Sequence, residues 1–170
     1  SKTDMSNLRL INETSFSSVN TVNVPNVFSA DYDIYKITSD VSGQYGLLKF
    51  INTSGIVISD ATYDTARLNL KLNTTFSETR VIGTNVGIYA FTESGGSGEG
   101  GNVLYIFNPF SSSSYTFVIA QNIDINTSTA HRIAKTIGVH KNTSSMGGFQ
   151  LNALAGVSGT MRTYGLRVDS

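Results

Sequence analysis

The stretch that decides the fold is Ala66-Arg67-Leu68-Asn69-Leu70-Lys71-Leu72-Asn73. Leucine alternates here with charged or amide side chains, and successive side chains of a β-strand point to opposite faces of its sheet. The alternation therefore predicts a half-buried strand. We expect Leu68, Leu70 and Leu72 to lie in a core between two sheets, with the polar residues facing water.

Similar alternation recurs along most of the chain, separated by Ser, Asn, Gly and Asp clusters that favour turns. A short segment over 129–136 is compatible with a helix, but its alternation favours a strand. This pattern predicts an all-β, antiparallel two-sheet sandwich, jelly-roll-like, with about eight to ten strands. The other predicted strands are 8–11, 22–28, 34–41, 47–51, 86–91, 103–107, 115–120, 149–154 and 160–168. Their aromatic residues Tyr89, Phe107 and Tyr164 are further candidates for the core.

Composition excludes several classes of protein. The 170 residues suit one domain and include 12 Lys or Arg, 12 Asp or Glu and no Cys, while Ser, Thr and Asn make up 56. A neutral chain lacks the positive charge that nucleic-acid binding needs. Without Cys, we expect no zinc finger, iron–sulfur site or disulfide scaffold. No apolar run is long enough for a membrane-spanning helix, so we expect no membrane insertion.

Candidate metal-binding and catalytic residues are few. Asp31 and Asp33, with Asp40, Asp60 or Asp64, could assemble an oxygen site for Ca²⁺, but the EF-hand spacing is missing and turn formation explains them better. On one strand His131 and His140 would lie on opposite faces, because their offset is odd. The carboxylates form no recognisable pair. We therefore predict no metal, no cofactor, no catalytic residue and no enzymatic activity.

Two polar segments are candidate contact loops. The glycine-rich segment 93–101 lies between predicted strands, which favours a long hairpin loop over a linker. A serine run follows Asn108-Pro109-Phe110 at 111–114. Tyrosine offers rigid apolar area with a polar tip, which suits contact with carbohydrate or protein. The candidate surface-contact residues are Glu93, Ser97, Glu99, Ser112, Ser113 and Tyr115.

Three segments together resemble small β-sandwich virion structural proteins of tailed bacteriophages. The first two are Val24-Pro25-Asn26-Val27-Phe28-Ser29-Ala30-Asp31-Tyr32-Asp33-Ile34-Tyr35-Lys36-Ile37 and Tyr105-Ile106-Phe107-Asn108-Pro109-Phe110, the latter followed by Tyr115-Thr116. The third is Gly159-Thr160-Met161-Arg162-Thr163-Tyr164-Gly165-Leu166-Arg167-Val168. They occur in the order seen in that family. The departures are Met161, where a β-branched residue is common, and Thr163, where an apolar one is common.

The resemblance implies a non-enzymatic virion protein on the particle exterior, made in the bacterial cytoplasm and associated with the tail or a fibre. Its expected partners are copies of itself, with a homotrimer preferred, and other virion proteins. A host surface glycan is a further candidate partner. Residues 1–18 would form an N-terminal arm or first strand that docks, and 19–170 the β-sandwich domain. The short segment before the resemblance favours the alternative of a capsid decoration protein. Alternatives of another class are a small glycan-degrading enzyme and a free carbohydrate-binding module.

Overall fold

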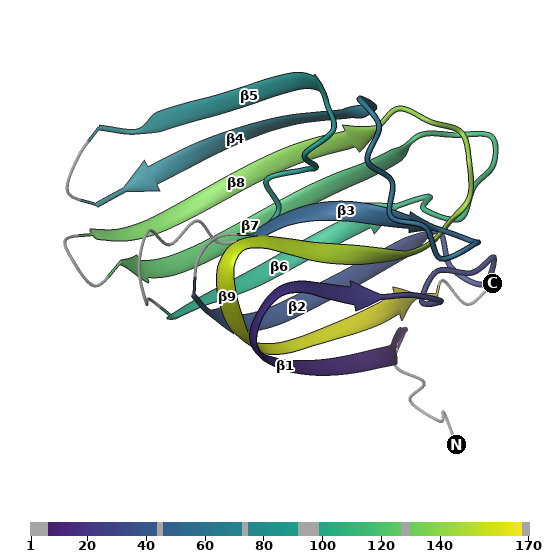
Figure 1. Ribbon diagram of the computed structural model, residues 1–170, viewed down its shortest axis with the longest axis horizontal. Coiled ribbons are helices and arrows are strands. Elements are labelled where there is room, and N and C mark those ends of the chain that lie inside the picture. Colours follow the sequence, from purple (N-terminus) through teal and green to yellow (C-terminus); the bar gives the residue numbers. More distant parts are fainter. Residues whose placement is uncertain (1–6, 44–45, 73–74, 92–98, 127–129, 168–170) are drawn as a thin grey trace.

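The computed structural model describes residues 7–43, 46–72, 75–91, 99–126 and 130–167, and these form β-strands and no helix. Within this described part, no helix is long and apolar enough to cross a membrane. Figure 1 shows the strands arranged in two layers. They are β1 (Leu8–Val24), β2 (Ile34–Ser42), β3 (Gly46–Asn52), β4 (Tyr63–Lys71), β5 (Ser77–Thr84), β6 (Glu99–Phe107), β7 (Thr116–Asn126), β8 (Ala130–His140) and β9 (Met146–Leu166).

All strand pairs are antiparallel, and hydrogen bonds join them in the order β1-β9-β2-β6-β7-β8-β4-β5, with β3 on β9. The long strand β9 changes partners along its length. Residues 158–166 pair with β2, whereas residues 146–153 pair with β3. The sheet therefore folds over itself at β9 and β1, so that β3 covers the inner face of the other strands (Figure 1).

Aromatic rings fill the space between the layers. Phe50 on β3 is fully buried, and its ring centroid lies 6.3 Å from that of Tyr63 on β4 and 5.7 Å from that of His140 on β8. Phe28 stacks on Phe149 of β9 at 6.1 Å. These contacts hold the two layers together. The prediction of an all-β antiparallel fold is confirmed, with both layers belonging to one continuous sheet.

The strands differ from those predicted in several places, and segment 86–91, predicted as a strand, forms only an isolated bridge at Ile88. Segments 8–11 and 22–28 contribute to the single strand β1, and the last two predicted strands fall within β9, because bulges let both long strands bend without ending. Residues 8–18, for which an arm or a first strand was predicted, are the first half of strand β1 and pair with β9. The sequence of β5, Ser77–Thr84, lacks the alternation that would have predicted it. The segment 129–136 falls largely within strand β8.

The predicted faces of β4 are wrong. Leu68 and Leu72 are exposed by 43% and 74%, and Leu70 is half-buried, whereas Arg67 and Asn69 are buried at 3% and 4% exposure. The remaining predicted core residues, Tyr89, Phe107 and Tyr164, are half-buried and lie outside the core cluster.

The reason for this inversion is the segment that covers β4. Residues 86–91 cross the inner face without forming a regular strand, so their backbone groups need partners from side chains. Thr136 donates to the Tyr89 carbonyl at 2.7 Å, and Asn122 donates to that of Ala90 at 2.8 Å. Gly138 leaves room for Ile88, because a Cβ there would lie 2.5 Å from Ile88 Cγ2. Polar residues therefore face inward, and the leucines face outward.

Replacing Leu68 by alanine is expected to change the free energy of unfolding by less than about 1 kcal/mol, because its side chain is already partly in water. Urea unfolding of both proteins measures this difference. A loss above about 2 kcal/mol would mean that the outer face of β4 is packed within the single chain.

Candidate functional site

The outer face of the sheet, turned away from β3, is unusually apolar. Cross-strand pairing places Ile119 of β7 beside Ile137 of β8, and Ile137 beside Ala66 of β4. The same pairing places Phe117 beside Phe107 of β6. Residues opposite each other in antiparallel strands share a face and touch, so these side chains form one continuous surface.

Eight large side chains on this surface are exposed by 37% to 78%. Together they expose about the area of four whole residues, or roughly 600–800 Å² at about 150–200 Å² each. The largest apolar patch on a typical monomer is roughly 300–600 Å². We name this surface the apolar face: Leu68, Ile82, Val103, Phe117, Ile119, Ile123, Ile133 and Ile137.

The inner side of the same strands is less apolar than the outer side. Along β7 the buried positions include Thr116, Asn122 and Asp124, while the exposed ones include Phe117 and Ile123. A sheet with one face in water normally shows the reverse pattern. The apolar face also contains a groove of about 550 Å³ between β5 and β7, lined by Ile82, Phe117, Ile119 and Ile137 among others.

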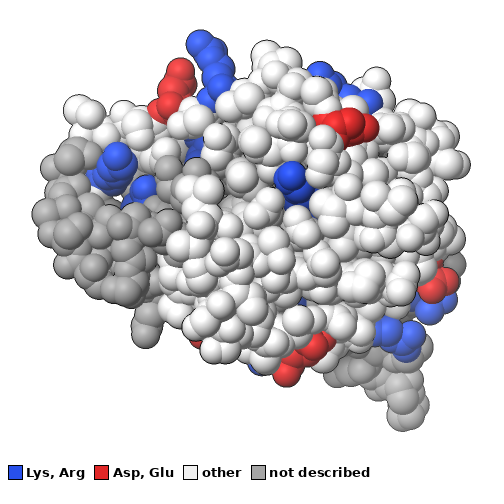
Figure 2. Space-filling view, viewed as in Figure 1, with Lys and Arg blue, Asp and Glu red and all other residues white. Residues whose placement is uncertain are grey.

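Charged residues of both signs lie on or around the apolar face. Lys135 of β8 pairs in register with Leu68, which in turn pairs with Glu78 of β5. At one end of the face Lys141 and Asp64 form an ion pair of 2.9 Å. The Gly83 amide donates to Asp64 at 2.7 Å, and this bond, with Lys141, lowers the pKa of the carboxyl group. Charges are also scattered on the side of the molecule drawn in Figure 2.

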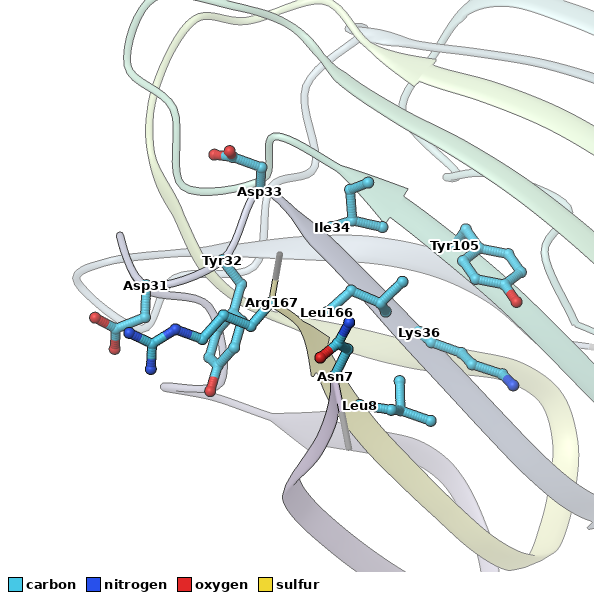
Figure 3. A pocket seen from close by; sticks show the side chains of 10 residues that line it. All are labelled: Asn7, Leu8, Asp31, Tyr32, Asp33, Ile34, Lys36, Tyr105, Leu166 and Arg167. Carbon is cyan, nitrogen blue, oxygen red and sulfur yellow. The ribbon is translucent and has the colours of Figure 1, made fainter. Parts of the chain in front are cut away.

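A second concave region lies at the other end of the outer face. This hollow of about 690 Å³ lies between the start of β1, the turn before β2, and strands β2, β6 and β9 (Figure 3). Two tyrosines, two carboxylates, two basic residues and an amide line it together with apolar side chains. Its lining residues are Asn7, Leu8, Asp31, Tyr32, Asp33, Ile34, Lys36, Tyr105, Leu166 and Arg167.

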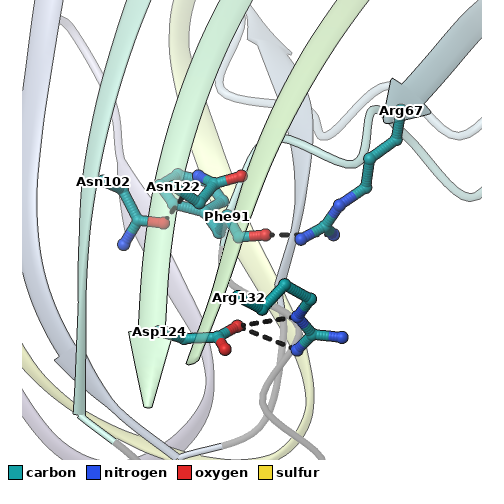
Figure 4. A network of polar contacts seen from close by, with 6 residues as sticks. All are labelled: Arg67, Phe91, Asn102, Asn122, Asp124 and Arg132. Carbon is teal, nitrogen blue, oxygen red and sulfur yellow. Dashed lines mark hydrogen bonds and ion pairs between the residues drawn. The ribbon is translucent and has the colours of Figure 1, made fainter. Parts of the chain in front are cut away.

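A buried polar network occupies the inner face where β6 and β8 begin and β7 ends (Figure 4). Asn122 donates to Asn102 Oδ1 at 2.8 Å, and Asn102 donates to Ser39 at 2.9 Å. Arg132 binds one oxygen of Asp124 through two nitrogens, at 2.8 and 3.2 Å. These bonds satisfy most of the polar groups named here, which would be costly to bury alone, whereas Asn122 Oδ1 has no hydrogen-bond partner. We therefore assign this network a structural role.

His140 is a buried imidazole in an aromatic environment. It is fully buried, its ring lies 5.0 Å from that of Tyr63, and neither ring nitrogen has a hydrogen-bond partner. Burial lowers the pKa of His140, with nearby Asp60 opposing the shift. The neutral form is therefore the one that the fold accommodates.

This environment predicts a pH-dependent stability. Below about pH 6.5 the unfolded chain binds a proton at His140 that the folded chain resists, so stability falls as the pH falls. The contribution reaches at most about 1.4 kcal/mol per pH unit between pH 6.5 and 5. Urea unfolding at several pH values measures how the free energy of unfolding depends on pH. This dependence should be weaker for His140→Phe than for the wild type. An unchanged slope would contradict the prediction.

The predicted contact residues fall into two groups. Ser112, Ser113 and Tyr115 lie in or beside the β6–β7 turn and are exposed, Tyr115 by 44%. Ser111 Oγ organises this turn by accepting from the amides of Ser113 and Ser114, each at 3.2 Å. Glu93 and Ser97 lie outside the described residues, and Glu99 begins β6. Among the described residues, Glu99 and the turn after Phe107 lie at opposite ends of β6.

The candidate calcium ligands have other partners. Asp31 accepts from Ser29 at 3.1 Å, and Asp60 accepts from Thr62 at 2.6 Å. Across the described part of the chain, no three His, Asp or Glu residues are grouped as a metal site. Sequence reasoning missed the apolar face, although the exposed residues of β7 and β8 alternate regularly. Of the residues on this face, only Leu68 is among the predicted core residues, and the sequence alone does not indicate which face of β7 or β8 is outer.

Comparison with known proteins provides no identification: no protein-family model, curated protein or solved structure matches the chain.

Proposed function

We propose that this protein is a non-enzymatic structural component of a bacteriophage virion, displayed on the particle exterior and associated with the tail or a fibre. The observation that carries this proposal is the apolar face, because an apolar surface of this size is typical of a subunit that assembles. The expected partners are copies of itself, preferably as a homotrimer, and other virion proteins.

The three segments that resemble phage virion proteins lie side by side in the fold. Ile34 of the first pairs with Phe107 of the second and Leu166 of the third, so β9, β2 and β6 are adjacent. Segments so distant in sequence thus contribute to one structural unit. This adjacency supports treating the resemblance as one pattern.

Quantitative mass spectrometry of purified particles tests the proposal. We expect the chain to be present in particles at about a dozen copies, as for a tail or fibre component. Hundreds of copies would instead support the alternative of a capsid decoration protein. Absence from intact particles would overturn the virion assignment altogether.

A carbohydrate-binding role is a second candidate, favoured by the hollow that contains Tyr32 and Tyr105 beside carboxylate and basic groups. Tyrosine rings and polar groups of this kind suit a sugar ring and its hydroxyls. The exposed Ser112, Ser113 and Tyr115 would extend contact with a host surface glycan.

Isothermal titration with host surface polysaccharide tests this role. Tyr105→Ala should abolish any heat of binding if the hollow holds the sugar. Release of reducing ends by the purified protein would support a glycan-degrading enzyme and overturn the non-enzymatic assignment.

A further inference from the structure

We propose that the apolar face is the surface through which this chain binds a second copy of itself. The inference deepens the proposed function, on which it rests, by naming the surface used for assembly. Its physical basis is the inverted pattern of β7, β8 and β4, in which large apolar residues face outward and polar ones inward.

The area of the apolar face suits a stable protein partner. Its exposed side chains amount to roughly 600–800 Å². A standard protein–protein interface buries about 800 Å² on each partner. The apolar face alone therefore supplies most of the area that a specific interface buries on each partner.

The shape of the face also suits a copy. Sheets pack face to face at about 10 Å with their side chains interdigitating. The groove lined by Ile82, Phe117, Ile119 and Ile137 offers a depression, and Ile123, exposed by 55%, lies on the same face outside it. Two such faces can therefore place side chains of one copy into the groove of the other.

The charged residues of the apolar face favour a second copy of this chain over a strongly charged partner. The face has both signs, with Lys135 and Arg80 near Glu78 and the neutralised pair Lys141–Asp64. When two copies pack face to face, the rotation that relates them places different residues opposite each other. A surface with charges of both signs can therefore bring opposite charges into contact. An anionic lipid surface would instead favour an excess of Lys and Arg.

The decisive experiment measures association of the purified full chain by sedimentation velocity over a range of concentrations. We expect the wild-type protein to form a dimer or a trimer, either of which supports the proposal. Ile137→Lys should raise the dissociation constant at least tenfold, because it inserts a charge at the centre of the contact.

Ile56→Lys is the matched control. Ile56 is exposed by 62%, close to the value for Ile137, but it lies on the connection after β3 and outside the apolar face. This variant should associate like the wild type. Circular dichroism and thermal unfolding of both variants show whether either one has lost its fold.

Disulfide trapping provides a readout that does not depend on a disruptive variant. The chain has no cysteine, so Ile137→Cys introduces a single thiol. We expect oxidation to yield a covalent dimer for Ile137→Cys or Ile119→Cys, and little for Ile56→Cys.

A monomer at all concentrations, or association that Ile137→Lys leaves unchanged, would overturn the proposal. Binding of the monomer to lipid vesicles through Ile137 would also overturn it, in favour of a membrane surface. These results concern purified protein alone. Failure of the virion assignment, measured on particles, can therefore be distinguished from failure of this interface.

Discussion

Phe50→Ala is expected to lower the free energy of unfolding by about 3–5 kcal/mol. Phe50 has no exposed surface and packs against Phe28, Tyr63 and His140, which come from other parts of the chain. Removing its ring leaves a cavity between β3 and the strands beneath it. The loss therefore combines the transfer free energy of the ring with the cost of that cavity.

Urea-unfolding midpoints of the wild-type and variant proteins measure this loss. Ile56→Ala is the control, because Ile56 is 62% exposed and its truncation should change stability by less than about 0.5 kcal/mol. If Phe50→Ala cost as little as the control, the packing of β3 over β4 and β8 would be disproved.

The sequence predicts the fold class correctly because strand alternation is a local property. It does not predict which side of a strand is inside, since that depends on what covers the sheet. In β4, leucine hydrophobicity favoured the interior, yet Thr65 and Arg67 lie there and bond to the backbone of the covering segment. The sequence of that segment, 86–91, predicts a strand, and nothing in it indicates that it crosses the sheet instead.

The candidate site shows the same limitation. Ser112, Ser113 and Tyr115 are exposed as polar loop residues should be, but the main surface feature is formed by regular strands. The alternation in β7 and β8 reveals two faces of different character without indicating which is outer. Only the pairing of Ile119 with Ile137 and of Ile123 with Ile133 shows that apolar side chains gather on one face, where the pair Gln121–Lys135 lies between them.

The buried ion pair between Asp124 and Arg132 allows a second large effect to be predicted. Arg132→Met should destabilise the protein by about 3–5 kcal/mol, because Asp124, only 2% exposed, loses its cationic partner. Most of this loss reflects the burial of a carboxylate that has lost this ion pair, since two well-packed apolar residues can replace a buried ion pair at little cost.

The double variant Asp124→Leu/Arg132→Met separates these two contributions. It should recover at least half of the stability that Arg132→Met loses, because neither member of the pair is then buried without the other. Urea unfolding of the wild type, both single variants and the double variant completes the thermodynamic cycle. Equal or greater destabilisation of the double variant would mean that the pair itself, with its two bonds of 2.8 and 3.2 Å, stabilises this end of the inner face. Recovery of stability in the double variant would mean that the fold requires balanced charges at this site and not the ion pair itself. The polar side chains beneath the covering segment would then serve mainly to satisfy one another.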